Sequence, residues 1–304
     1  MGINSSNLHV SIVLPTYNRA EMLGKCVDSI IAQTYTKWEL IISDDCSCDD
    51  TCQIIEELSK IDKRIRYHFN EKHRGLPKNR NAAISLAKYN FIFFIEDDLI
   101  LDRFCLEILI NTYLDLKGKG ENIGGIAPRL IIRQIRGPRM EKFKKKKNLS
   151  AEQEAPVSTI DKRIGTFKDN YSATFPEPVE AINVHACTLY PKFVLLDVGG
   201  YEENAYKGNY SYEDKDLNTR IRKKGYKLFF QSKAISYHYM AGKGGCRILS
   251  PFATDYYNWR NHIVFLARNF GKSSLYMVPL FLVFIFSSII KYSCYSMIYK
   301  FKKF

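Results

Sequence analysis

The chain has 304 residues, 46% of them hydrophobic and 25% charged, which suits one large domain or two with a buried core. Its 45 lysines and arginines exceed its 32 acidic residues, and the net charge of +13 favours anionic partners: nucleic acid, anionic lipid or phosphorylated substrates. The eight cysteines lack the paired spacing of a disulfide-rich extracellular domain, and no secretory signal is evident, so we expect reduced thiols in the cytosol.

Residues 10–95 alternate between strand and helix patterns. The expected strands are 10–15, 38–43, 65–69 and 91–95, and the expected helices are 20–33, 51–60 and one beginning near Pro77. Such alternation predicts an α/β fold, Rossmann-like, with a mainly parallel central sheet and flanking helices. Ligands of such sheets bind at the carboxyl ends of the strands.

Polar residues stand at three of these strand ends. They are the segment Tyr17–Arg19, the pair Asp44 and Asp45, and the run Glu96–Asp98 directly after the apolar strand 91–95. Adjacent carboxylates at a strand end can hold a hard divalent cation, act in acid–base catalysis, or be neutralised by a nearby Arg or Lys. Acidic pairs also cap helices and fill turns, so the run is not specific by itself.

A helix over 103–117 and an apolar run over 123–132 follow. Residues 133–178 show little periodicity and contain Lys144–Lys147, so we expect a mobile basic insertion. The lysine run is either solvated surface or a contact for anionic lipid. Order then returns with a strand and short helix before the glycine pair 199–200.

A second acidic pair, Glu213 and Asp214, begins the next expected helix, which ends at Gly225. Asp216 and Arg220 fit a supporting i, i+4 ion pair within it. The strand after this helix ends at His238. The glycine-rich turn at 242–247 is either an anion-binding nest or an ordinary loop.

The composition changes near residue 273. The stretch 275–299 has 25 residues and a single charge, so it either crosses a bilayer or lies in its interface. The basic end at 300–303 favours the cytoplasmic side, which conflicts with a single crossing from a cytosolic domain. We therefore divide the chain into a catalytic domain at 1–272 and a hydrophobic membrane segment at 273–304, with both topologies open.

Taken together, the segments "SIVLPTYNRAEMLGKCVDSIIAQTYTKWELIISDD", "GLPKNRNAAISLAKYNFIFFIEDDLI", "GGYEE", "YEDKDLNTRIRKKGYKL" and "ISYHYMAG" resemble the inverting family-two glycosyltransferases of the GT-A fold. The resemblance covers roughly residues 8–245, in the family's order and spacing. It implies transfer of a sugar from a nucleotide-diphosphate sugar to a hydroxyl acceptor by metal-assisted single displacement. The implied cofactor is Mg²⁺ or Mn²⁺.

The resemblance also implies roles for individual residues. Asp98 and His238 would bind the metal, and Glu96, where the family more often has Asp, would reach it directly or through water. Asp214 would take the acceptor's proton, with Glu213 orienting acceptor or base. The implied donor-binding residues are Pro15, Thr16, Tyr17, Asn18, Arg19, Asp45, Arg80, Glu96 and Asp97.

Alternatives stay open for several of these residues. Asp45 would accept the imino proton of the base, or else belongs to a turn or cap. Arg80 would approach the nucleotide or diphosphate, or else is a surface helix arginine. His185 is a weaker candidate for acceptor contact. The donor nucleotide is open between uridine and guanosine.

The tail and the basic insertion favour a membrane-associated protein with its catalytic domain on the cytoplasmic side. The expected acceptor is a glycan or polyprenyl- or dolichyl-linked saccharide, and the expected partners include membrane lipid but no nucleic acid. A protein or soluble polysaccharide is the alternative acceptor. The competing function is a non-catalytic, membrane-associated nucleotide-sugar-binding protein; a nicotinamide site is excluded because "PTYNR" replaces a Gly-x-Gly-x-x-Gly turn.

Overall fold

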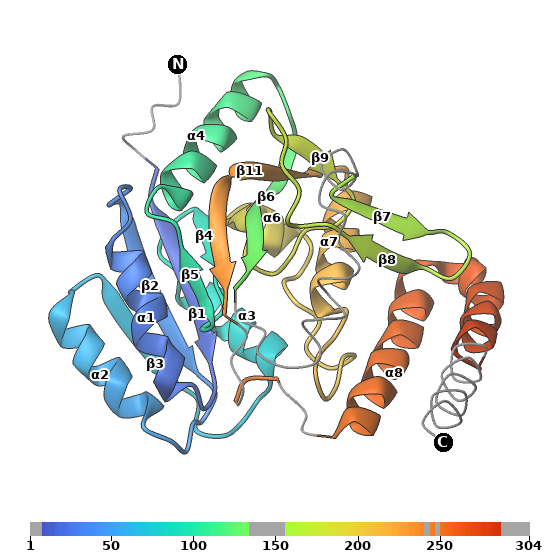
Figure 1. Cartoon of the computed structure of the whole chain (residues 1–304), viewed down its shortest axis with the longest axis horizontal. Coiled ribbons are helices and arrows are strands. Elements are labelled where there is room, and N and C mark those ends of the chain that lie inside the picture. Colours follow the sequence, from blue (N-terminus) through green and yellow to red (C-terminus); the bar gives the residue numbers. More distant parts are fainter. Residues whose placement is uncertain (1–7, 134–155, 240–243, 247–249, 287–304) are drawn as a thin grey trace, which may run out of the picture.

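The computed structural model describes residues 8–133, 156–239, 244–246 and 250–286. Figure 1 shows a central twisted sheet with helices packed on it and a C-terminal helical pair at one side. The strands are β1 (Val10–Thr16), β2 (Trp38–Asp44), β3 (Ile65–Phe69), β4 (Phe91–Phe94), β5 (Leu99–Leu101), β6 (Ile123–Ile132), β7 (Ser158–Asp161), β8 (Thr166–Asp169), β9 (Val179–Ala181), β10 (Leu189–Pro191) and β11 (Lys227–His238). The helices are α1 (Ala20–Ile31), α2 (Thr51–Ile61), α3 (Leu76–Leu86), α4 (Cys105–Gly118), α6 (Lys192–Asp197), α7 (Glu213–Lys223) and α8 (Pro251–Asn269).

The N-terminal half of the sheet is parallel, as predicted. Strands β3, β2, β1 and β4 lie side by side in that order, each parallel to its neighbour. Because β1, β2 and β4 are buried on both faces, they consist of nearly continuous apolar runs. Side chains of α1, α2 and α4 join the core on one face, and those of α3, α6 and α7 join the core on the other.

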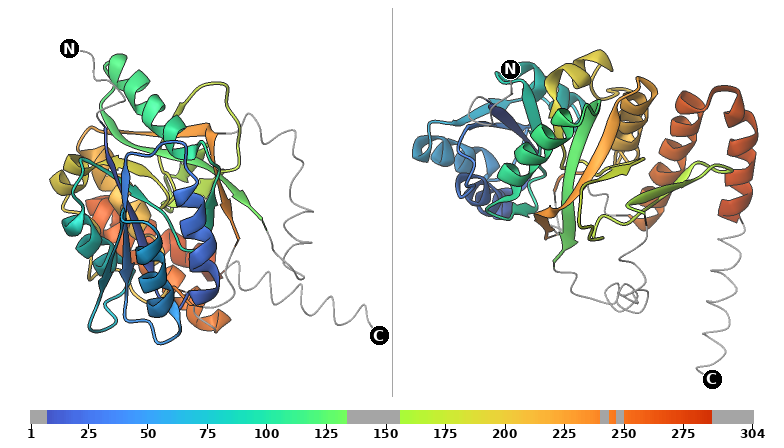
Figure 2. Two further views of the ribbon diagram at one scale, coloured as in Figure 1. Left: turned by 90° about the vertical axis from the view of Figure 1, so that its left-hand side faces the viewer. Right: turned by 90° about the horizontal axis from the view of Figure 1, so that it is seen from above.

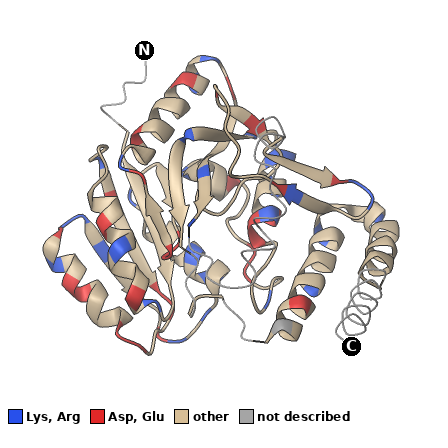
Figure 3. Cartoon of the chain, viewed as in Figure 1, with Lys and Arg blue, Asp and Glu red and all other residues tan. Residues whose placement is uncertain are grey.

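The remainder of the sheet is mixed: β6 and β11 are parallel to each other, but three short antiparallel strands join them, so the prediction of a mainly parallel sheet is confirmed only in part. Strand β10 runs antiparallel between β4 and β6, and β5 and β9 run antiparallel to β11. These three strands have only three residues each, so no two-residue periodicity could reveal them. Figure 3 shows the sheet drawn mostly without charged residues, whereas charges gather on the helices and at strand ends.

A third apolar cluster joins the C-terminal part of the chain to the rest. It contains Phe265 and Leu266 of α8, Met277 and Phe281 of a helix over residues 274–286, and the partly buried Phe167 of β8. Strands β7 and β8 form an antiparallel hairpin that reaches from the sheet to these two helices (Figure 2). The expectation of a mobile, irregular insertion over 133–178 was therefore wrong for residues 158–169; Lys144–Lys147 lie outside the described residues.

No helix within the described ranges is both long enough and apolar enough to cross a membrane. The helix over 274–286 exposes large apolar side chains, among them Leu275, Val283 and Phe286, the first of which is 79% exposed. The predicted membrane segment at 273–304 is described only as far as residue 286.

Candidate active site

A cleft of about 660 Å³ opens at the carboxyl ends of β1, β2, β4 and β11. Eleven of the predicted site residues line it: Pro15, Thr16, Tyr17, Arg19, Asp45, Glu96, Asp97, Asp98, Glu213, Asp214 and His238. They come from five separate segments of the chain, and the sheet topology brings them together. Among the described residues, Asn18 and Arg80 are the predicted ones that do not belong to this lining.

The predicted metal ligands form a compact group. One ligand atom from each of Glu96, Asp98 and His238 lies within 4.8 Å of the others, and His238 Nε2 is 3.2 Å from Asp98 Oδ1. Sheet register explains this proximity: β5 pairs antiparallel with β11 so that Leu99 faces His238, which places His238 beside Asp98, 140 positions earlier in the chain. Two carboxylates and an imidazole fit Mn²⁺, or Mg²⁺ with fewer protein ligands.

Asp97, between the two acidic candidates for metal binding in the sequence, contacts residues at the end of β1 and just before α1. Its carboxylate accepts a hydrogen bond from Thr16 Oγ1 at 2.8 Å and lies 3.4 Å from Arg19 Nε. Arg19 NH1 also lies 3.7 Å from Asp98 Oδ2. Burial, together with the neighbouring Asp98 and Glu96 carboxylates, raises the pKa of Asp97 to about 7, although Arg19 and Thr16 oppose the rise. The cluster thus carries more negative charge than the protein neutralises, as a cation site requires.

At the far end of the cleft, Asp45 is fixed by backbone donors. It accepts hydrogen bonds from the amides of Arg74 and Gly75, both at 2.8 Å, and from Asn70 Nδ2 at 3.0 Å. Gly75 has φ +89°, a conformation that side chains rarely adopt, and an added Cβ would lie 2.1 Å from the Tyr210 hydroxyl. The rigid hold on Asp45 keeps its carboxylate an acceptor facing the cleft.

An aromatic pair stands beside Asp45. The rings of Tyr17 and His73 are 4.4 Å apart, and His73 Nδ1 lies 3.0 Å from Asp45 Oδ2. The amide of Gly245 donates to Tyr17 O at 2.8 Å, so the glycine-rich turn lies over the segment after β1. Asn18 instead supports this end of the cleft, since its side chain accepts from the amide of Cys48 at 2.8 Å.

The two acids that begin α7 differ in their surroundings. Glu213 is 6% exposed and pairs with Arg80, whereas Asp214 is only partly buried and lines the cleft with its carboxylate turned back to the amide of Lys215 at 2.8 Å. Tyr212, the residue before them, has φ +74°. Left-handed backbone in a residue other than glycine costs energy, and it recurs at functional sites.

Arg80 is not the surface helix arginine that one interpretation of the sequence proposed. It is 1% exposed, so it is no surface arginine, and it lies beneath the cleft between Glu213 and Glu96, the latter at 3.5 Å. The ring of Tyr201 stacks 4.9 Å from its guanidinium carbon. Burial raises the pKa of Glu213 to about 8, although Arg80 opposes the rise. Arg80 therefore connects the acid that begins α7 to one of the three clustered metal-ligand candidates.

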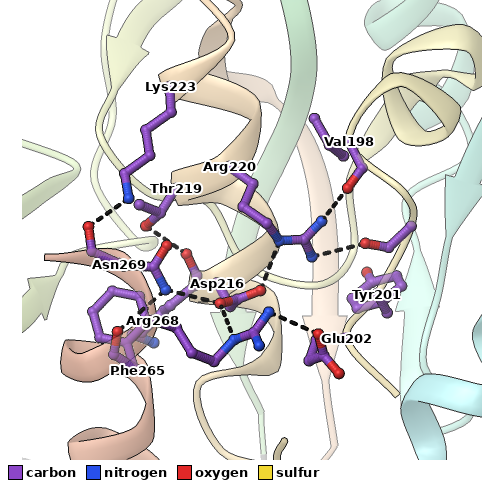
Figure 4. A network of polar contacts seen from close by, with 12 residues as sticks. Val198, Tyr201, Glu202, Asp216, Thr219, Arg220, Lys223, Phe265, Arg268 and Asn269 are labelled. Carbon is purple, nitrogen blue, oxygen red and sulfur yellow. Dashed lines mark hydrogen bonds and ion pairs between the residues drawn. The ribbon is translucent and has the colours of Figure 1, made fainter. Parts of the chain in front are cut away.

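Helix α7 is anchored from its far side by Asp216, as Figure 4 shows. The fully buried Asp216 carboxylate accepts from Arg220 Nε at 2.8 Å, from Asn269 Nδ2 at 2.8 Å and from Arg268 Nε at 3.3 Å. The predicted i, i+4 pair is confirmed, and the two residues from the end of α8 extend it. This network fixes the orientation from which Glu213 and Asp214 project.

Several lining residues escaped the sequence analysis. They are His73, Leu76, Asn79, Phe167, Asp169, Ala186, Gly208–Tyr212 and Lys215, whereas the lining residues Gly245 and Cys246 belong to the predicted glycine-rich turn. Most lie on loops or on the hairpin, where no periodicity marks them; the strongest missed signal was Lys215, directly after the acidic pair. His185 is buried and its Nε2 donates to Pro128 O at 2.7 Å, so its role in the structure is a contact with β6.

Comparisons with known proteins agree with this geometry. Residues 11–154 match the model of glycosyl transferase family 2. The chain is 38% identical over 90 residues to the GalNAc(5)-diNAcBac-PP-undecaprenol beta-1,3-glucosyltransferase of Campylobacter jejuni, covering 29% of each protein. It is 37% identical over 105 residues to the Escherichia coli UDP-Glc:alpha-D-GlcNAc-diphosphoundecaprenol beta-1,3-glucosyltransferase WfgD, covering 34% of this chain and 41% of the relative. The matched segments thus span less than half of either relative.

Solved structures extend the likeness beyond the matched segment. TarS 1-349 of S. aureus in complex with UDP-GlcNAc superposes with a TM-score of 0.59 at 17% identity, covering 90% of this chain and 72% of that one. The mannosyltransferase PcManGT of Pyrobaculum calidifontis in complex with GDP-Man and Mn²⁺ gives 0.57 at 16% identity, covering 87% and 65%. Residues 11–154 are therefore similar in sequence to a glycosyltransferase family 2 domain, and the described part of the chain has the GT-A fold.

Proposed function

We propose that the protein is an inverting glycosyltransferase that moves a sugar from a nucleotide-diphosphate sugar to a hydroxyl of a lipid-linked or cell-envelope glycan. The observation that carries the proposal is the convergence of Glu96, Asp98 and His238 with Asp214 in one cleft. Glu96, the departure from the family's usual Asp, lies within reach of the other two candidate ligands, which favours a working site over a degenerate one.

The nucleotide would lie near the ring of Tyr17 and the carboxylate of Asp45, which is a fixed hydrogen-bond acceptor. Its diphosphate would point toward Asp98. Glu96, Asp98 and His238 would hold Mg²⁺ or Mn²⁺, which when bound supplies positive charge that stabilises the leaving nucleoside diphosphate. Arg19, 3.4 and 3.7 Å from the carboxylates of Asp97 and Asp98, would keep those carboxylates in place.

Asp214 would act as the general base. As the acceptor oxygen attacks the anomeric carbon, its proton passes to the Asp214 carboxylate while the bond from that carbon to the diphosphate oxygen breaks. A single in-line displacement of this kind inverts the anomeric configuration. Glu213 is buried against Arg80 and would position α7, so the proton transfer falls to Asp214.

The proposal for the acceptor rests on two observations. The relatives from C. jejuni and E. coli carry undecaprenol-linked substrates in their names. The helix over 274–286 exposes apolar side chains on a chain of net charge +13, which suits contact with an anionic membrane surface. We therefore propose membrane association through the C-terminal segment with the catalytic domain on the cytoplasmic side.

The direct test incubates the protein with Mn²⁺, a panel of labelled nucleotide sugars and an undecaprenyl-diphosphate-linked N-acetylhexosamine. We expect transfer from one donor, with an anomeric configuration opposite to that in the donor, and loss of transfer in Asp214→Asn without loss of nucleotide binding. Nucleotide binding without turnover of any donor would favour the non-catalytic binding protein instead. Retained configuration in the product would refute the single displacement.

A further inference from the structure

One wall of the cleft is not accounted for by donor or metal. It consists of Phe167 and Asp169 of β8, the loop 208–212 and Lys215 of α7, and it lies outside the residues that match the family model. We propose that this wall is a subsite for an uncharged pyranose of the acceptor, held by Phe167 and the Asp169–Lys215 pair. The inference rests on the proposed function and adds the chemical class of the acceptor sugar.

The hairpin that carries this wall is anchored at its turn. The ring nitrogen Nε2 of His262 in α8 donates to Ile164 O at 2.7 Å. Gly165 packs so closely that an added Cβ would lie 2.3 Å from Leu266 Cδ2. The ring of Phe167 lies 5.7 Å from that of Phe265. Because α8 fixes the hairpin this way, Phe167 and Asp169 form a preformed wall.

The polar part of the wall, Asp169 and Lys215, is fixed by contacts with neighbouring residues. Asp169 Oδ1 accepts from Asn183 Nδ2 at 3.3 Å, while Asp169 Oδ2 lies 3.5 Å from Lys215 Nζ. Lys215 Nζ also lies 5.7 Å and 5.5 Å from the ring centres of Phe167 and Tyr212. Burial lowers the pKa of Lys215, but the carboxylates of Asp214 and Asp169 raise it by more, so the side chain stays a cation.

These groups match the surface of a pyranose. A pyranose has an apolar face of C–H groups that packs on an aromatic ring, and a rim of hydroxyls that both donate and accept hydrogen bonds. Phe167 supplies the ring, Asp169 the acceptor and Lys215 the donor. Asp214 lines the same cleft and interacts electrostatically with Lys215, so a sugar held here would present a hydroxyl to the candidate base.

The charges of the wall favour an uncharged sugar over an acidic one. Among the described residues that line it, Lys215 is the single cation and faces both Asp169 and Asp214. The nearby Glu213 contacts Arg80 and is not part of the wall. The wall and the adjacent Asp214 together place two carboxylates around one cation, and a uronate or phosphate placed here would meet net repulsion.

The test uses the full chain saturated with UDP or GDP, whichever binds, and Mn²⁺. Methyl β-D-glucopyranoside and methyl β-D-glucuronide are then titrated and their binding followed by saturation-transfer NMR. The variants are Asp169→Asn, Lys215→Met and Phe167→Ala. The matched control is Lys168→Ala, which removes an exposed side chain from the opposite face of the same strand.

We expect the glucopyranoside to bind more tightly than the glucuronide. Its affinity should fall roughly tenfold in each of the three variants, as for the loss of one hydrogen bond or stacking contact, and stay unchanged in Lys168→Ala. Nucleotide affinity should be unchanged in all four, which also verifies folding; Asp169→Asn, nearly isosteric, carries the test if Phe167→Ala does not fold.

Three results would overturn the subsite: no binding of either glycoside, glucopyranoside binding that the three variants leave intact, or tighter binding of the glucuronide. Failure of the wild-type protein to bind any nucleotide would instead refute the proposed function itself. The nucleotide titration, carried out first, therefore separates the two failures.

Discussion

Glu213 offers a quantitative check on the electrostatics beneath the cleft. Its carboxyl is 6% exposed, and its pKa is raised from 4.5 to about 8 by burial, against the pull of Arg80. A raised pKa in the native state means that the stabilising contribution is complete below pH 4.5 and is lost as the pH rises through 8. Between these values the unfolded chain releases the proton and the native protein keeps it, so stability falls by about 1.4 kcal/mol per pH unit.

Glu213→Gln removes this titration while keeping the shape and an oxygen acceptor for Arg80. The free energy of unfolding of the variant, relative to that of the wild type, should therefore rise by about 4 kcal/mol between pH 5 and pH 8 and level off above pH 8. Urea unfolding of both proteins at one-unit pH steps measures this difference. Glu57→Gln, at an exposed position of α2, controls for the loss of a carboxyl. Parallel stability curves for wild type and Glu213→Gln would refute the reasoning.

Three further changes test the cleft and its support. Asp214→Asn should lower transfer roughly 10²- to 10⁴-fold in a labelled-donor assay while leaving the nucleotide Kd unchanged; weakened nucleotide binding would argue against a base role. Gly75→Ala should reduce nucleotide affinity and Tm together, because the new Cβ displaces the Tyr210 hydroxyl and disturbs the amide that holds Asp45; a neutral calorimetric result contradicts this. Burial raises the pKa of Asp216, but Arg220, Asn269 and Arg268 lower it by more, so the native pKa lies below the ordinary value of 3.8. The contribution of Asp216 to folding stability is therefore present above pH 3.8 and is lost as the pH falls through the native pKa. Asp216→Asn should therefore cost about 3 kcal/mol in urea unfolding at pH 7 and less near pH 3; an equal cost at both values would show that charge is not its role.

The parallel half of the sheet was predictable because its signals are local. The buried strands β1, β2 and β4 are nearly continuous apolar runs, and the helices between them have one apolar face, so type and order follow from periodicity. Sequence also placed Asp45 and Asp98 at strand ends, where a parallel sheet brings such residues together.

The remaining features of the fold and of the cleft depend on contacts between segments that are distant in the sequence. The proximity of His238 to Asp98 follows from the antiparallel pairing of β5 with β11, and β5 has only three residues. The burial of Arg80 depends on its contact with Glu213, 133 positions later, and no local sequence pattern indicates such a contact. Likewise Phe167 and Asp169 reach the cleft only because α8 holds the hairpin turn. Long-range pairings of this kind cannot be predicted from the patterns of short sequence segments.

The central claim is that Asp98 belongs to a cation site that binds a nucleoside diphosphate. Calorimetric titration of the full chain with UDP and GDP, with and without Mn²⁺, tests it most directly, with Asp98→Ala beside the exposed control Asp115→Ala on α4. We expect binding of one nucleotide that depends on Mn²⁺, persists in Asp115→Ala and is lost in Asp98→Ala. Binding that needs no metal and survives in Asp98→Ala, or no binding under any condition, would contradict it.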